Sequence, residues 1–366
     1  MRILHVIGGI MKAAGTSVFC VEIADGLKKA GYEVAIAVRN PQRMDAYPSR
    51  FKVPLIYISD VKEALYYHKW DIVHLHGLWE KELYQISRYA HKVGVKVVWS
   101  PHGTLTPWAM RFKRFKKALF WWCFMRREVN RAELLHVTAE SEVGDMHRNG
   151  LSSPKIIVPL GVRTSLSDVE LDRIKSSIQN AKNRIFLFVS RLQKKKGLLN
   201  LVEAWYKLKK ENAELIHGWK IVIAGPDQEN HRFEVSNVAK IYDVIDDFEF
   251  LDPVYGSDKD KLYAQASVFV LPTFSENFGS VVIEALSNKT PVITTKGAPW
   301  YELEEQNAGW WIEIGVEPLK KALKNAILLD DSERLQMGER GMQLVAERYE
   351  WNAITKKMIL GYKSIL

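Results

Sequence analysis

The stretch VFVLPTFSENFGSVVIEALSNKTPVITT, residues 268–295, holds the local pattern from which the fold can be predicted. An apolar run rich in β-branched residues stands at each end, and SVVIEALSN between the two runs has a helical spacing of apolar residues. A strand, a helix and a second strand in this order predict two parallel strands joined by a right-handed crossover. The stretch therefore predicts an α/β domain built on a parallel sheet.

The same alternation runs through both halves of the chain. Strand-like segments in the first half are RILHVIG, EVAIAVR, LIYI, IVHLHG, VKVVWSPHG, ELLHVTA and KIIVPLG, and in the second half RIFLFVSR, KIVIAG and FEFLD precede the opening stretch. The polar segment 164–183 is expected to be an interdomain linker. We predict two Rossmann-like domains, 1–163 and 164–350, that face each other across a ligand cleft, with an amphipathic helix at 351–366 that packs back on the first domain.

Composition narrows the class of protein. The 366 residues are 47% hydrophobic and 26% charged, which is typical of a globular chain. Residues 1–163 carry 25 Lys and Arg against 14 Asp and Glu, while the remainder carries 27 against 29. The first half is therefore expected to meet something anionic: nucleic acid, phospholipid or a phosphorylated substrate.

Location is predicted from what the sequence contains. Two cysteines give neither a disulfide framework nor a metal-binding spacing, which suits a reducing compartment. The first residues, MRILHVIGG, read as a strand rather than a signal peptide, and no apolar run reaches the roughly 18 residues of a spanning helix. We expect a cytoplasmic protein.

A basic loop, SRLQKKKG at 190–197, follows the first strand of the second half. Arg191 stands at the strand end, and Lys196 comes just before a glycine and a helix. Fixed cations at a helix N-terminus suit a diphosphate, since Arg offers a fork and Lys a point charge. Lys194 and Lys195 are expected to be solvated.

Two carboxylates bracket the turn of the opening stretch. Glu276 is placed at a strand end, and the amides of Asn277, Phe278 and Gly279 would form the first turn of the helix, where unpaired N–H groups bind oxygen anions. Glu284 lies further into the helix among apolar neighbours and is expected to reach a ribose diol. The alternative is that Glu276 only complements the helix terminus and Glu284 lies on the surface.

The first half offers weaker candidates. The loop 8–16, with Gly9 and Gly15, joins a strand to a helix and lets a ligand approach the backbone, although an ordinary turn explains it equally well. It does not match the dinucleotide-binding glycine fingerprint. His102, followed by a glycine at another strand end, is expected to be functional, whereas His76 is expected to be structural.

These residues together resemble the retaining glycosyltransferases of the GT-B fold, family 4. Glu276 and Glu284 match that family's E-x7-E motif, Arg191 and Lys196 its R-x4-K pair, and His102 its HG motif. SPHGTLTPWAM, TAESEV and GAPWYELEEQNAGWW resemble bacterial capsule, exopolysaccharide and O-antigen members. The resemblance covers nearly the whole chain, although the first loop, which carries Lys12-Ala13-Ala14 here, varies within the family.

The resemblance implies transfer of a sugar, with retention at the anomeric carbon, from a UDP- or GDP-sugar to a lipid-linked or growing saccharide in surface-polysaccharide synthesis. Arg191 and Lys196 would neutralise the diphosphate, Glu284 would hold the ribose, and Glu276 with the amides of 277–279 would hold the donor sugar, near His102. No metal or other cofactor is expected, since the cations replace a metal and no D-x-D follows a strand. The alternatives are a sugar-nucleotide epimerase or phosphorylase of this fold, or an inactive sugar-nucleotide-binding partner of a polysaccharide complex.

The run RFKRFKKALFWWCFMRR, residues 111–127, combines seven basic residues with many aromatic and aliphatic ones. This composition suits the interface of an anionic membrane, and it agrees with a lipid-linked acceptor at the inner membrane face. A helix with an aromatic core side and a solvated basic face is the structural alternative. Nucleic-acid binding is disfavoured, because no recognition motif accompanies the run.

Overall fold

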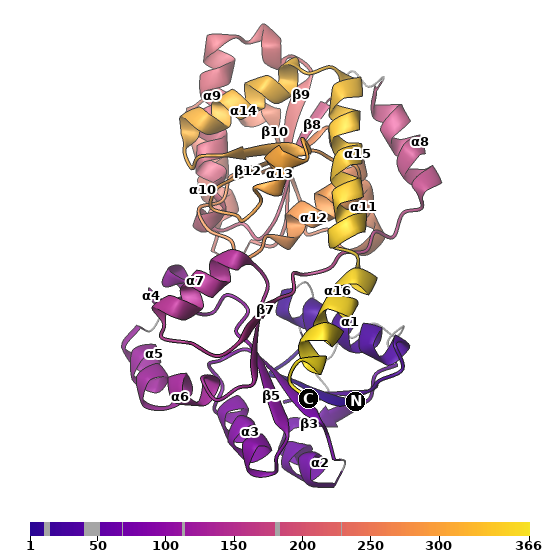
Figure 1. Cartoon of the computed structure of the whole chain (residues 1–366). Coiled ribbons are helices and arrows are strands. Elements are labelled where there is room, and N and C mark those ends of the chain that lie inside the picture. The colour runs from indigo at the N-terminus through magenta and orange to yellow at the C-terminus, as the bar shows by residue number, and fades with distance from the viewer. Residues whose placement is uncertain (11–14, 40–51, 68, 112–113, 180–183, 228) are drawn as a thin grey trace. The chain divides into compact units, whose positions relative to one another are not determined.

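The structure is a computed structural model that describes residues 1–10, 15–39, 52–67, 69–111, 114–179, 184–227 and 229–366 (Figure 1). The chain divides into two compact units. Unit 1 comprises Met1–Gly161 and Trp351–Leu366, and unit 2 comprises Val162–Glu350. The first segment of unit 1 therefore ends at Gly161, two residues before the predicted boundary at Arg163. Residues 351–366, at the other end of the sequence, also belong to unit 1, as predicted.

Unit 1 is built on a seven-stranded parallel sheet with the order β3-β2-β1-β4-β5-β6-β7. The strands are β1 (Arg2–Ile7), β2 (Glu33–Val38), β3 (Leu55–Tyr57), β4 (Ile72–His76), β5 (Lys96–Ser100), β6 (Leu134–Val137) and β7 (Lys155–Ile157). The helices are α1 (Gly15–Lys29), η1 (Ile58–Asp60), α2 (Val61–Tyr67), α3 (Lys81–Lys92), α4 (Pro107–Arg111), α5 (Arg114–Phe120), the π-helical turn η2 (Trp121–Met125), α6 (Arg126–Val129), α7 (Glu140–Arg148) and α16 (Trp351–Lys363).

The two faces of this sheet differ in polarity, because side chains alternate along a strand. One face carries the large apolar cluster that includes Leu4, Val6, Val73 and Leu75. The intervening positions of the same strands are His5, His74 and His76, all buried. That second face lies under α1 and α16, which pack together (Figure 1).

Unit 2 contains a six-stranded parallel sheet with the order β10-β9-β8-β11-β12-β13. Its strands are β8 (Arg184–Val189), β9 (Trp219–Ala224), β10 (Phe248–Leu251), β11 (Val268–Leu271), β12 (Val292–Thr295) and β13 (Gly309–Ile312). Its helices are α8 (Asp168–Gln179), η3 (Lys194–Lys196), α9 (Leu198–Glu211), η4 (Glu214–Ile216), α10 (His231–Ile241), η5 (Ile245–Asp247), α11 (Gly256–Gln265), α12 (Ser280–Ser287), α13 (Glu302–Glu305), α14 (Val316–Leu328) and α15 (Asp331–Arg348). The predicted pair of parallel α/β domains is confirmed.

The expected linker at 164–183 is wrong for residues 168–179, and its last four residues, 180–183, lie outside the described residues. Residues 168–179 form α8, which belongs to unit 2. Leu171 is fully buried in a small cluster with Ala264, and the buried amine of Lys175 donates to the hydroxyl of Thr290 at 2.9 Å. The apolar residues of α8 are few, but they lie on one helix face, which packs against unit 2, while the polar residues lie on the opposite face.

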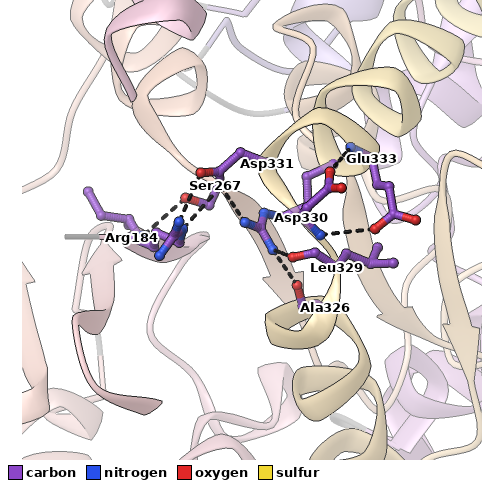
Figure 2. Close-up of polar contacts among 9 residues, drawn as sticks. Arg184, Ser267, Ala326, Leu329, Asp330, Asp331 and Glu333 are labelled. Atoms are coloured by element: carbon purple, nitrogen blue, oxygen red, sulfur yellow. Dashed lines mark hydrogen bonds and ion pairs between the residues drawn. The ribbon is translucent and has the colours of Figure 1, made fainter. Parts of the chain in front are cut away.

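The start of α15 is fixed by polar contacts, which Figure 2 shows. Asp330 caps the helix by accepting from the amide of Glu333 at 2.7 Å, and the Glu333 carboxylate accepts from the amide of Asp330 at 2.9 Å. Arg184, the first residue of β8, donates two hydrogen bonds to the Asp331 carboxylate, at 3.0 and 2.9 Å. This fork joins the sheet of unit 2 to its longest described helix.

No helix of the described ranges is long and apolar enough to cross a membrane.

Candidate functional site

The predicted diphosphate residues lie where the strand order of unit 2 reverses. Consecutive strands run outward from β8 on one side and from β11 on the other. In open α/β sheets, ligands bind outside the carboxyl ends of the strands at this switch point. Arg191 and Lys196 follow β8 there, and Glu276 follows β11.

A glycine brings these two loops into contact. Gly197 has a φ of 74°, and a Cβ at this position would collide with the carbonyl oxygen of Pro272. The Lys195 carbonyl accepts from the Phe274 amide at 2.8 Å and from the Thr273 hydroxyl at 3.0 Å. Only glycine permits both the left-handed backbone and this close approach, so the loop after β8 is held against the loop after β11.

The contact buries an ion pair. The Lys196 amine, whose side chain is 7% exposed, pairs with Oε1 of Glu276, whose side chain is 10% exposed. The same oxygen lies 3.2 Å from the Thr273 hydroxyl oxygen, and the Glu276 amide donates to the Gly297 carbonyl at 2.7 Å. The sequence placed Lys196 and Glu276 in one site, and the structure brings them together.

Two more cations stand close to this pair. Burial lowers the pKa of Lys195, the charges of Lys196 and Arg191 lower it further, and the Glu276 carboxylate opposes them. Lys195 is thus half-buried within the charged group, and its expected solvation is wrong. Lys194, in contrast, is exposed and pairs with Glu234 at 3.4 Å. Lys195 and Lys196, with the exposed Arg191 nearby, outnumber the Glu276 carboxylate, and this excess of positive charge favours an anion.

The turn before α12 is also shaped for close approach. Gly279 has a φ of 82°, and a Cβ there would lie 3.3 Å from the indole nitrogen of Trp300. Phe278 is buried, and its carbonyl accepts from that indole at 2.6 Å. Trp300, which the sequence did not single out, holds the turn, so that Asn277 and the first amides of α12 lie at the carboxyl edge of the sheet.

Glu284 is a half-buried, hydrogen-bonded carboxylate rather than a simply solvated one. It accepts from the Tyr263 hydroxyl at 2.9 Å and pairs with the Lys259 amine at 3.0 Å. Burial raises the pKa of Tyr263, so its hydroxyl keeps its proton and donates. Lys259 and Tyr263 stand four residues apart on α11, a spacing that puts both on one helix face. The ribose as ligand stays a prediction.

In unit 1 the glycine loop is only partly described. Gly9 and Gly15 flank residues 11–14, so Lys12 and the two alanines lie outside the described residues. A Cβ at Gly9 would meet nothing within 4 Å, and one at Gly15 would lie 3.6 Å from Leu160. The described residues of unit 1 therefore leave room for a Cβ at both positions, and the role of these glycines toward a ligand stays a prediction.

His102 follows β5 in a left-handed conformation, with a φ of 52°. The next amide, that of Gly103, donates to the buried Glu142 carboxylate at 2.6 Å, and the Thr138 amide donates to its other oxygen at 2.9 Å. Glu142 thereby fixes the turn. Burial, and then the charge of His136, lowers the pKa of His102 to about 3, so the imidazole is neutral at pH 7.

His102 belongs to a buried histidine cluster that the sequence did not predict. His76 Nδ1 lies 2.9 Å from His102 Nε2, and His76 Nε2 lies 2.9 Å from His5 Nδ1. His74 and His136 lie beside them, as the ring contacts show. One sequence pattern could have indicated this cluster: histidines alternate with apolar residues in a predicted strand, as in VHLH at 73–76, so they lie on one face of the sheet.

Ring nitrogens of His5, His74 and His76 lie within 4.8 Å of one another, close enough to hold a metal ion. However, both ring nitrogens of His74 and both of His76 are hydrogen-bonded to other side chains. Metal binding would break these bonds, so the cluster as it stands is a hydrogen-bond network.

Family models match both units. The model described as "Glycosyl transferases group 1" matches residues 170–344, and the "Glycosyl transferase 4-like domain" matches residues 14–161. The D-inositol 3-phosphate glycosyltransferase of Corynebacterium glutamicum is 29% identical over 256 residues, which are 65% of this chain and 59% of that protein. An uncharacterized glycosyltransferase of Methanocaldococcus jannaschii is 29% identical over 49% of this chain and 45% of its own length. The chain thus spans about half the length of the curated relatives it matches.

Solved structures show the same fold. HepE of Anabaena, in complex with UDP and glucose, has a TM-score of 0.79 at 14% identity, with 100% of both chains covered. WaaG, described as a glycosyltransferase involved in lipopolysaccharide biosynthesis, has a TM-score of 0.69 at 18% identity, with 97% of this chain and 98% of its own covered. Both units thus match glycosyltransferase family models, and the fold is that of the GT-B glycosyltransferases.

Proposed function

We propose that the protein is a retaining glycosyltransferase that moves a sugar from a nucleoside-diphosphate donor, UDP- or GDP-linked, to a lipid-linked or growing saccharide. The observation that supports this most directly is the Lys196–Glu276 pair at the switch point of unit 2, with Arg191 and Lys195 beside it. Cations fixed at the carboxyl edge of a parallel sheet suit a diphosphate, and a carboxylate beside them suits sugar hydroxyls.

The proposed chemistry rests on charge placement. When the bond between the anomeric carbon and the diphosphate oxygen breaks, negative charge collects on the leaving diphosphate. Arg191 and Lys196 stabilise that charge, and Lys196 can turn to it from Glu276, because a Lys side chain is flexible. Glu276 and the amides of 277–279 hold the donor sugar, Glu284 accepts from the ribose hydroxyls, and His102 contacts the sugar.

The proposed reaction needs no metal ion, because the cations of the loop 190–197 supply the charge stabilisation. Transfer is expected to continue in excess EDTA. Loss of transfer on chelation, with recovery on adding Mg²⁺ or Mn²⁺, would contradict this part of the proposal.

The acceptor is proposed to be lipid-linked and presented at the cytoplasmic membrane face, in bacterial surface-polysaccharide synthesis. The support is a patch of exposed apolar side chains on α5 and η2, here called the aromatic patch: Phe115, Leu119, Trp122 and Phe124. Arg114 and Arg126 lie over Phe115 and Trp122 at 4.8 and 4.6 Å. Trp121 and Met125 of the same turn are buried, so only one side of the segment is core. Exposed aromatic residues among cations suit an anionic lipid surface.

Donor binding and transfer are tested together. The melting temperature is measured with UDP, GDP and their common sugars, since a ligand of the folded state raises it. Lys196→Met and Glu284→Gln are expected to abolish transfer, while Lys194→Met, an exposed lysine of the same loop, leaves it unchanged. Full activity of Lys196→Met would overturn the assignment. A rearranged sugar released without acceptor would show an epimerase instead.

Membrane docking is tested by vesicle sedimentation. The protein is expected to bind phosphatidylglycerol vesicles and not phosphatidylcholine vesicles, and to bind less as salt rises. Leu119→Asp should abolish binding, whereas Ile241→Asp, at an even more exposed apolar residue of unit 2, should not. Equal binding of both variants would refute the role of the aromatic patch.

A further inference from the structure

The polar face of unit 1 holds two separate hydrogen-bond chains, here called the tyrosine chain and the histidine chain. The tyrosine chain runs through Tyr362, His74, Ser100, His136 and the Val158 carbonyl, at 2.6, 2.5, 2.6 and 2.7 Å in that order. The histidine chain runs through His5, His76 and His102, with 2.9 Å at each step. Every imidazole in them is buried enough that its pKa lies below the ordinary value, so all five are neutral at pH 7.

The tautomers of the tyrosine chain follow from its last member. A carbonyl only accepts, so His136 donates to Val158 through Nε2–H, and its Nδ1 must accept from the Ser100 hydroxyl. The Ser100 oxygen then accepts from His74 Nε2–H. His74 Nδ1 in turn accepts the hydroxyl proton of Tyr362. Both histidines are therefore Nε2–H tautomers.

The histidine chain allows only two states. A neutral imidazole carries one N–H, and each of the two hydrogen bonds needs one N–H and one bare nitrogen. Either all three rings are Nδ1–H tautomers, with protons directed from His5 toward His102, or all three are Nε2–H tautomers, with protons directed inward. The tautomer of His102 is therefore tied to that of His76.

The inner end of the chain decides between the two states. Among the described residues, His5 Nε2 is buried without a hydrogen-bond partner. In the inward state it would be a buried N–H with no acceptor, a rare arrangement in proteins. In the outward state it is a bare ring nitrogen, and the proton lies at His102 Nδ1. The outward state is therefore favoured.

We propose that His76 is a positioning residue that holds His102 as the Nδ1–H tautomer, so that His102 offers a hydrogen-bond donor, and not a base, to an oxygen atom of the ligand. The Nδ1–H assignment of His102 is inferred from the geometry of unit 1 alone. Its use in transfer rests on the proposed function, in which the ligand oxygen belongs to the donor sugar or its diphosphate.

The direct test is nuclear magnetic resonance of the full chain with ¹⁵N-labelled histidine, in which long-range couplings identify the protonated nitrogen of each ring. His5, His76 and His102 are expected to be Nδ1–H, and His74 and His136 Nε2–H. An Nε2–H or a doubly protonated His102 at pH 7.5 would overturn the proposal. Addition of UDP, GDP and then UDP-glucose shows whether a phosphate or a sugar oxygen shifts the His102 Nδ1–H signal, and no shift with a ligand that raises the melting temperature overturns the donor role.

Two matched substitutions separate positioning from packing. His76→Phe removes the partner of His102, whereas His5→Phe removes one 2.9 Å bond of the same chain and leaves His76–His102 intact. We expect His76→Phe to shift His102 toward the Nε2–H tautomer, which is the common one in water. We also expect kcat/KM to fall about tenfold, which corresponds to about 1.4 kcal/mol of lost transition-state stabilisation. His5→Phe should keep the His102 tautomer and stay within about twofold, because roughly 0.4 kcal/mol or less is involved.

The donor role is checked at His102 itself. An Asn amide keeps a donor near the position of Nδ1, whereas an Asp carboxylate of the same size only accepts. His102→Asn is expected to retain at least tenfold more transfer than His102→Asp, and equal activity would overturn the proposal. If transfer is absent from the wild type while the tautomers are as stated, the proposed function fails and the tautomer assignment stands.

Discussion

Acidification is expected to unfold unit 1 through its buried histidines. Burial lowers the pKa of His5 to about 3 and that of His136 to about 4, from an ordinary 6.5. A histidine whose pKa is lower in the folded state binds fewer protons there than in the unfolded chain. Stability is therefore complete above pH 6.5 and falls as the pH drops below it.

The size of the loss follows from linkage. At pH 5 the unfolded state gains about 2 kcal/mol from protonation of one such histidine, so His5 and His136 together remove about 4 kcal/mol relative to pH 8. The pKa values of His74 and His76 are lowered by burial as well, which adds in the same direction. A domain is commonly stable by about 5–15 kcal/mol, so unit 1 should unfold near pH 4 to 5.

Hydrogen exchange of the full chain, read by mass spectrometry from pH 8 to pH 4, assigns the loss to peptides of each unit. The free energy of opening of β1 and β4 should fall by about 4 kcal/mol or more between pH 8 and pH 5. In His5→Phe the fall should be smaller by about 2 kcal/mol, whatever the starting stability. An equal fall in the variant, or none in β1 of the wild type, would refute the reasoning.

Three further predictions concern single side chains. Burial lowers the pKa of Lys175 to about 7, so stability should rise with pH from about 7 to 10.5, and Lys175→Met should remove this rise in denaturant titrations at several pH values. Gly197→Ala should lower the free energy of unfolding of unit 2 by about 2 kcal/mol or more, because the backbone there is left-handed and a Cβ would collide with the Pro272 carbonyl. An unchanged urea midpoint would contradict this account of the loop. Glu142→Gln should cost about 1–3 kcal/mol in the same titration, since its amide NH₂ faces an N–H group of Gly103 or Thr138, and a loss below 0.5 would refute this.

The parallel sheets were predictable because their signals are local. Strands buried on both faces read as continuous apolar runs, and the helices between them have apolar residues at helical spacing. The presence of Lys196 and Glu276 in one site was also predictable, because both follow strands and the carboxyl ends of parallel strands share one edge. The ion pair between them was not predicted. α8 was missed because its docked face has few apolar residues and one of its buried side chains is that of Lys175, a residue type that is rarely buried.

Partners distant in sequence could not be read from the chain. Trp300 holds the turn at Phe278, and Glu142 holds the turn at Gly103, because the fold brings each of them there from another part of the chain. The histidine chain depends on the register of β1 with β4, in which His5 pairs with His74. Register is set by the packed sheet, so alternating histidines become a network only in three dimensions.

The return of α16 to unit 1 affects the order in which the protein can fold during synthesis. Tyr362 of α16 supplies the first donor of the tyrosine chain, and Trp351 of the same helix packs against Phe19 of α1. The ribosome delivers these residues only after all of unit 2. Domains commonly mature in the order in which they emerge. Here unit 2, a continuous segment, can finish folding first, whereas the sheet of unit 1, although synthesised earlier, has only α1 and not α16 on its histidine face until then.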